Sequence, residues 1–179
     1  NATPSGNSVD GDLAVSGSIT AGANVTAVNR VTANTISATN YVGVTGRILQ
    51  SVQTNSGTQA STTGGSYSAT GFYASITPSS VSSKILVLLY APLWQTNGYG
   101  GNSFLTVYRN GASFVSSGAD FIVLSAPGQN MYGSVSFNYL DSPASTSTQT
   151  YQPYIRSDQF GQCFFNGTGA AVLTLVEIL

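Results

Sequence analysis

The chain has 179 residues, of which only 6% are charged, and it carries a formal net charge of −1 and no histidine. An ordinary soluble domain has about 25% charged residues, so neutral polar side chains cover most of this surface. The five basic residues are scattered, and they are too few to neutralise a nucleic-acid backbone. The absence of histidine excludes His-based triads and His-ligated metal sites, and no apolar run reaches the roughly 20 residues that cross a bilayer.

The N-terminal part of the chain is a linker followed by a short repeat. Residues 1–9 are rich in Ser, Asn, Gly and Pro and are interpreted as linker. Over residues 10–46 a β-branched residue, a hydroxyl residue and alanine recur at steps of five or six residues, in copies that begin at Ile19, Val25, Val31 and Ile36. Each copy offers one apolar side chain and one methyl group, which is too little to bury a core within a single chain. The repeat therefore predicts a stem of short β segments that several identical chains form around a common axis.

From residue 47 onward the sequence changes to longer stretches with the alternation of β-strands, and no stretch has the pattern of a helix. We expect strands at 48–52, 72–76, 84–93, 104–108, 113–115, 121–124, 131–140, 150–156, 162–165 and 171–179. Between two of them, Asn110-Gly111 predicts a type I′ hairpin turn. The pattern predicts an all-β domain over residues 47–179, an antiparallel β-sandwich of jelly-roll type.

Two of the expected strands, 84–93 and 171–179, are apolar on both faces. In the first, Leu86, Leu88 and Tyr90 share one face, and the alternate apolar residues share the other. A strand with two apolar faces is covered on both sides. We therefore expect one face of the sheet to pack against the core and the other face to pack against symmetry-related copies of the chain.

The sequence offers few groups for catalysis. The acids of this domain are Asp120, Asp141, Asp158 and Glu177. A glycosidase needs two carboxylates about 5–9.5 Å apart. We expect Asp141 to hydrogen-bond the backbone of a turn, Glu177 to pair with Lys84 or Arg109, and the other two acids to be solvated. The sequence therefore predicts no catalytic residue and no cofactor.

Two further features are interpreted as structural. Asp10-Gly11-Asp12 provides two carboxylates, which alone make a weak calcium site, so it is interpreted as a solvated turn and no metal site is predicted. Cys163, the single cysteine, lies in an apolar stretch without a nearby base to lower its pKa. We expect a buried, inert thiol.

Two segments expected to be loops contain the candidate binding residues. Residues 94–102 combine the single tryptophan with amides and glycines, and residues 157–161 hold an acid and a phenylalanine. An aromatic ring beside amide groups is a common arrangement for holding a sugar or anchoring a partner. The candidates are Trp94, Asn97, Tyr99, Asn102, Asp158 and Phe160. The alternative is that Trp94 and Phe160 close the ends of the sandwich core or lie in an interface between chains.

Four phrases in order carry a resemblance to a known family. They are Ser75-Ile76-Thr77-Pro78-Ser79-Ser80, Ser82-Ser83-Lys84-Ile85-Leu86-Val87, Tyr139-Leu140-Asp141-Ser142-Pro143-Ala144 and Leu173-Thr174-Leu175-Val176-Glu177-Ile178, with Tyr108-Arg109-Asn110-Gly111 between them. With them, residues 47–179 resemble a head domain of tailed-bacteriophage fibre and tailspike proteins, which follows thin repetitive stems like residues 13–46. The resemblance implies a homotrimer, a jelly-roll head related in shape to tumour-necrosis-factor-like trimers, and host-surface recognition. It carries over no binding residues.

These observations lead to one main hypothesis and three alternatives. The chain is expected to be the non-enzymatic, homotrimeric tip of a tail fibre, a virion component that binds a bacterial surface glycan or protein and joins the rest of the fibre. It is expected to bind no nucleic acid and to insert into no membrane. The alternatives are a purely structural trimerisation or decoration domain, a glycan depolymerase, and a bacterial adhesin of the same architecture.

Overall fold

The computed structural model describes residues 46–97, 101–114, 122–125, 130–158, 161–167 and 169–179. The linker and nearly all of the stem repeat lie outside these ranges, so the trimeric stem built on Ile19, Val25, Val31 and Ile36 stays a prediction. The described residues form strands joined by turns and loops, and they contain no helix with the length and apolarity that a membrane span needs. The expected all-β class is confirmed for this part of the chain.

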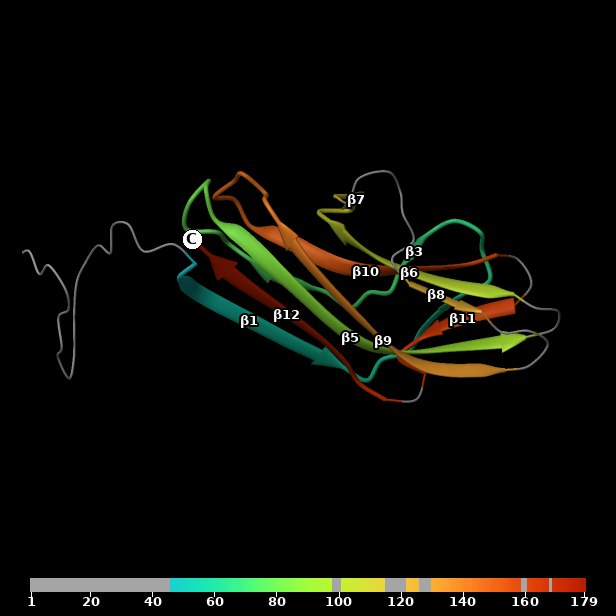
Figure 1. The fold of residues 1–179 in the computed structure, drawn as a ribbon. Coiled ribbons are helices and arrows are strands. Elements are labelled where there is room, and N and C mark those ends of the chain that lie inside the picture. Colours follow the sequence, from blue (N-terminus) through green and yellow to red (C-terminus); the bar gives the residue numbers. More distant parts are fainter. Residues whose placement is uncertain (1–45, 98–100, 115–121, 126–129, 159–160, 168) are drawn as a thin grey trace, which may run out of the picture. The chain divides into compact units, whose positions relative to one another are not determined.

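The first of two sheets, called sheet A, is antiparallel and contains six strands. Its strands are β1 (Ile48–Ser56), β12 (Ala171–Ile178), β5 (Lys84–Asn97), β11 (Gly161–Phe165) and β2 (Ala60–Thr62) in that order, with β9 (Met131–Asp141) paired to β5. β5 is long enough to pair with β12 along its first part, with β11 along its second part and with β9 along most of its length. Figure 1 shows β1, β12, β5 and β9 side by side.

The second sheet, called sheet B, is also antiparallel and is built around two central strands. Its order is β3 (Ser68–Ala69), β10 (Gln149–Ser157), β6 (Asn102–Arg109) and β7 (Ala112–Ser113), with β4 (Ala74–Ile76) paired to β10 and β8 (Ile122–Ser125) paired to β6. The turn between β6 and β7 has the predicted geometry. Asn110 has φ 52° and Gly111 has φ 79°, and a type I′ turn requires positive φ at both central residues.

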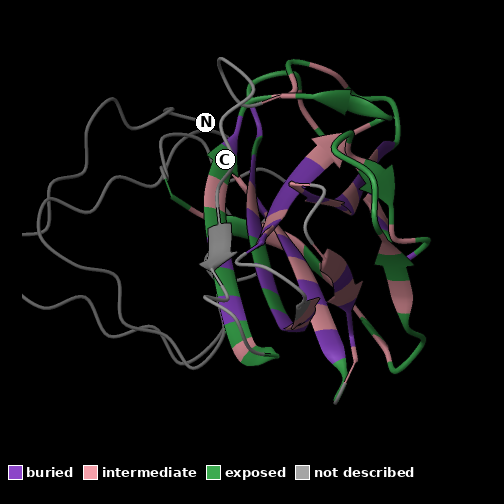
Figure 2. Cartoon of the chain, turned by 90° about the vertical axis from the view of Figure 1, so that its right-hand side faces the viewer, coloured by how far each residue is buried: buried purple, intermediate pink, exposed green. Residues whose placement is uncertain are grey.

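The core lies between the two sheets, because alternate residues of each strand point inward. On β10 and β12 buried residues alternate strictly with half-buried ones, and Figure 2 shows this alternation along the strands. The core takes Ile85, Val87 and Leu89 from β5, and Tyr151 and Ile155 from β10. Removing these apolar surfaces from water is the main favourable contribution to folding.

Several strand ends differ from the prediction, as in β1, which continues to Ser56. Three further differences are strand segments at positions where none was expected. β5 continues to Asn97 through residues expected to form a loop. β2 and β3 were not expected, since their short stretches of Ala, Ser and Thr have no apolar alternation. All three gain hydrogen bonds from partners distant in the sequence, and such pairing does not depend on a local apolar pattern.

Candidate functional site

Trp94 lies inside β5 and not in a loop, which corrects the expectation for residues 94–97. Its neighbours Leu93 and Gln95 are fully buried, so Trp94 points the other way, to the outward face of sheet A. There its indole stacks between Phe164 of β11 and Tyr132 of β9, with ring centroids 4.4 Å and 5.3 Å away. Trp94 therefore belongs to an aromatic row across the outside of the sheet and does not close the end of the core.

Asn102 and Asp158, which come from the two candidate segments, are brought into direct contact. The Asn102 side-chain amide donates a hydrogen bond to Asp158 Oδ2 across 2.5 Å, and the Asp158 backbone N–H donates to the Asn102 carbonyl. Asp158 is half-buried, so the expectation that it is fully solvated is wrong. This contact ties the start of β6 to the end of β10.

The other three candidate binding residues, Asn97, Tyr99 and Phe160, do not form a site within the described part of the chain. Asn97 is the last residue of β5 and pairs through its backbone with Gly161. Tyr99 and Phe160 lie outside the described residues, as does the acid Asp120. Their assignment as binding residues stays a prediction.

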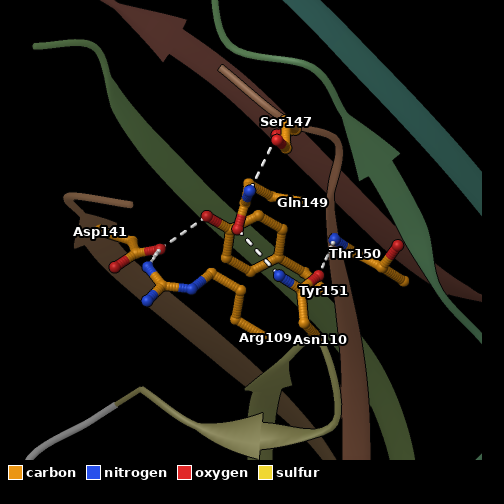
Figure 3. Close-up of polar contacts among 7 residues, drawn as sticks. All are labelled: Arg109, Asn110, Asp141, Ser147, Gln149, Thr150 and Tyr151. Carbon is orange, nitrogen blue, oxygen red and sulfur yellow. Dashed lines mark hydrogen bonds and ion pairs between the residues drawn. The ribbon is translucent and has the colours of Figure 1, made fainter. Parts of the chain in front are cut away.

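Asp141 is buried and forms an ion pair with the half-buried Arg109, instead of the expected bond to its turn backbone. Arg109 donates from Nη1 to Asp141 Oδ2 across 2.6 Å, and the Tyr151 hydroxyl donates to the same oxygen across 2.6 Å (Figure 3). Burial raises the pKa of the Tyr151 hydroxyl above its usual range, and the neighbouring carboxylate raises it further. The phenol therefore stays protonated and remains a donor to Asp141.

Beside this ion pair, the hairpin residue Asn110 is hydrogen-bonded to two residues of β10. Its amide donates to Gln149 Oε1 across 2.9 Å, and the Thr150 backbone N–H donates to Asn110 Oδ1 across 2.8 Å (Figure 3). Gln149 in turn donates to the Ser147 carbonyl. The network satisfies buried polar groups at one end of the sandwich, which is a structural role.

Glu177 is fully buried, and it pairs with neither of the expected bases. Its carboxylate accepts hydrogen bonds from the Ser79 backbone N–H and hydroxyl, from the Ser83 hydroxyl and from the Gln50 side-chain amide, at 2.6–2.7 Å. Burial acts to raise the pKa of Glu177, but these hydrogen bonds outweigh it and lower the pKa to about 2. The two expected partners lie elsewhere. Arg109 forms an ion pair with Asp141, and Lys84 is exposed on the outward face of β5, whereas Glu177 is buried.

Several residues of these networks stand in the phrases that carry the family resemblance, although partners such as Gln50 and Tyr151 do not. Ser79, Ser83 and Glu177 stand in three of the phrases and meet around one carboxylate. Arg109 and Asp141 stand in two others and form the ion pair. The phrases therefore mark points where distant strands are joined, and they describe the scaffold more than a ligand site.

Cys163 matches the expectation of an inert thiol. It is fully buried in β11, and burial raises its pKa to about 11, so the reactive thiolate is not populated at neutral pH. Among the described residues no three metal-ligating side chains gather in one group.

The outward face of sheet A exposes apolar side chains between β1 and β9. Leu88 is 38% exposed, Tyr90 is 45% exposed and Leu140 is 47% exposed. Cross-strand pairing puts Val176 beside Leu86 and Val172 beside Tyr90, and apart from Lys84 the outward residues of β5, β9 and β12 are uncharged. A shallow hollow of about 260 Å³ lies over this face. The predicted double-sided apolar strands are thus present, with one face in the core and the other face open.

Two features of the surface were not found from the sequence. On sheet B, the rings of Tyr108 and Tyr154 stack at 4.2 Å, and the Arg156 guanidinium lies 3.6 Å above the ring of Phe104. Where β1 ends, a pocket of about 420 Å³ is lined by Thr54, Ser56, Thr58, Thr70, Gly71, Phe72 and Tyr73. Its residues come from two separate segments, 54–58 and 70–73, and neither segment has a local pattern that marks a site, so only the fold reveals it.

Comparisons with known proteins do not assign a family. No protein-family model matches the chain, and no curated protein matches it. Among solved structures, a mutant VP2 protein of infectious bursal disease virus, in derived T=1 particles, is similar at 14% identity with a TM-score of 0.36, over 73% of this chain. The match covers 36% of that viral protein, so this chain spans about a third of its length.

Proposed function

We propose that this chain is the homotrimeric, non-enzymatic tip of a phage tail fibre and attaches the virion to a bacterial surface glycan or protein. The main supporting observation is the outward face of sheet A, where Leu88, Tyr90 and Leu140 are open and nearly all outward residues are uncharged. Large apolar side chains that are exposed together on one sheet face are typical of an interaction site. We assign this face to contacts between copies of the chain, because the stem repeat also needs further copies to bury its apolar side chains.

The finer fold belongs to the same proposal. The two antiparallel sheets enclose one core, and we assign them to a jelly-roll head that follows a trimeric stem over residues 10–46. A globular head holds the three stem strands in register, which a repeat of low information content does poorly by itself. The stem would place the head at the far end of a thin fibre.

Attachment to a hydroxyl-rich surface agrees with the chemistry of the head. Ser, Thr, Asn, Gln and Tyr replace charged residues over most of the surface, since only 6% of the chain is charged. Such groups both donate and accept hydrogen bonds without requiring a counter-ion. In a trimer, three weak contacts act together because the second and third are effectively intramolecular.

The proposal is tested by incubating the fluorescently labelled full chain with a panel of bacterial strains. We expect retention on some strains and loss of retention when their surface polysaccharide is oxidised with periodate or their surface proteins are digested. A folded trimer that binds no strain would assign the chain to the structural alternative. Release of polysaccharide fragments that stops in Asp120→Asn or Asp158→Asn would show a depolymerase instead.

A further inference from the structure

The pocket where β1 ends lies at the open edge of sheet A and is separate from both aromatic surfaces. One wall is formed by Thr54 and Ser56 at the end of β1 and by Thr58 just after it. The other wall is the segment 70–73, which leads into β4 of sheet B. Its volume of about 420 Å³ falls within the range of sites that hold small ligands.

The lining of this pocket has the chemistry of a site for a neutral, hydroxylated ligand. Five of its residues carry hydroxyl groups, including Tyr73, whose exposed side chain also provides an aromatic ring, and no lining residue is charged. Within the described part of the chain, the hydroxyls of Thr54 and Thr58 have no hydrogen-bond partner, so each is available to donate and accept. Tyr73 is 57% exposed, which leaves its ring open to a ligand.

Both walls are held in place by hydrogen bonds to the rest of the fold. Asn166 is 3% exposed and has φ 66°, and its amide donates to the carbonyls of Ser56 and Thr58. The Thr70 hydroxyl donates to the Pro153 carbonyl across 2.9 Å. Because the walls are fixed before a ligand arrives, little conformational entropy is lost on binding.

We propose that this pocket binds a neutral saccharide unit, with the Tyr73 ring against the apolar face of the sugar and the hydroxyls of Thr54 and Thr58 bonded to its rim. The proposal deepens the attachment function and rests on it, since it names the part of the head that meets a surface glycan. Aromatic faces pack well against apolar C–H surfaces. The absence of charge in the lining disfavours a uronic acid, whose carboxylate would lose water without gaining a cationic partner.

The test is saturation-transfer NMR of the full chain with four neutral sugars, namely glucose, galactose, mannose and N-acetylglucosamine, and with glucuronate as the anionic comparison. We expect at least one neutral sugar to bind and glucuronate not to bind. The variants Tyr73→Ala and Thr54→Val should each weaken that binding about tenfold. The matched control is Tyr132→Ala, because Tyr132 is 58% exposed but lies in the aromatic row of sheet A.

Several results would overturn the pocket assignment. They are binding of none of the four neutral sugars, unchanged binding in both pocket variants, and loss of binding in Tyr132→Ala with Tyr73→Ala unaffected. Circular dichroism of each variant verifies its fold. Cell attachment is measured in parallel: attachment that survives both pocket variants overturns the pocket alone, whereas sugar binding in the pocket without attachment to any strain supports the pocket and overturns the proposed function.

Discussion

Glu177 shows how a single buried charge is made stable in a chain with few charged residues. A carboxylate without exposure to solvent is unfavourable unless its oxygens accept hydrogen bonds. Here hydroxyl, amide and backbone N–H groups donate to both oxygens. The carboxylate of Asp141 is stabilised differently, by hydrogen bonds from the guanidinium of Arg109 and the hydroxyl of Tyr151. Local sequence cannot distinguish these solutions, because every donor to Glu177 lies at least 94 positions away.

Acid should weaken the fold through Glu177. Its pKa is about 2 in the folded chain and 4.5 ordinarily, so the unfolded chain binds the proton first as pH falls. The stabilisation is therefore complete above pH 4.5 and is lost progressively as pH falls toward 2, by about 3 kcal/mol in the free energy of unfolding. Urea unfolding measured across this pH range checks the prediction.

The variant Glu177→Gln supplies the control for that experiment. Its amide cannot accept from all the donors around it, so we expect it to lower the free energy of unfolding at pH 7 by about 2–3 kcal/mol. The part of the acid loss that belongs to Glu177 should disappear in this variant. An equally steep loss below pH 4.5 would show that another group is responsible.

At the scale of elements, β5 and β11 illustrate what local pattern predicts and what it does not. The stretch from Lys84 to Leu93 was expected to be a strand because of its apolar residues, and it is one. The residues that follow it are polar or aromatic, and they extend the strand because β11 and β9 pair with them on both sides. The hairpin at Asn110-Gly111 was predictable because two adjacent residues determine a type I′ turn.

Gly161, the first residue of β11, should not tolerate a side chain. A Cβ atom there would collide with the backbone carbonyl oxygen of Thr96 on β5, and backbone cannot move aside without breaking the pairing of the two strands. We expect Gly161→Ala to destabilise the chain by about 2–3 kcal/mol. Gly57→Ala is the matched control, because a Cβ at that position meets no atom within 4 Å, and it should leave the thermal midpoint nearly unchanged. Equal midpoints for both variants would contradict the prediction.

At the scale of the whole molecule, the outward face of sheet A is the surface through which the proposed trimer would form. A stable interface buries roughly 800 Å² on each partner. The face across β1, β12, β5 and β9 offers four adjacent strands with apolar, hydroxyl and amide side chains. The proposed trimer would cover this face and would leave the hydroxyl-lined pocket to meet the ligand.

A charge placed on this face should separate the copies. We expect light scattering of the wild-type chain to give about three times its mass of 18.4 kDa, and Leu88→Asp to give the mass of one chain, since three buried carboxylates would face an uncharged surface. Val81→Asp is the control, because Val81 is 64% exposed in the turn before β5, and it should remain trimeric. A wild-type chain that is monomeric at micromolar concentration would refute the trimer.

The sequence by itself determined the all-β class, the positions of most strands, the hairpin turn, the buried cysteine and the two strands with double apolar faces. These features follow from neighbouring residues, through alternation and turn chemistry. Only the tertiary structure decided which face of β5 is buried, that Trp94 points outward, which groups surround Glu177, and that the segments 54–58 and 70–73 form a pocket. The reason is physical: these features depend on the register between strands that lie far apart in the chain, and register is set by the packing of the whole core.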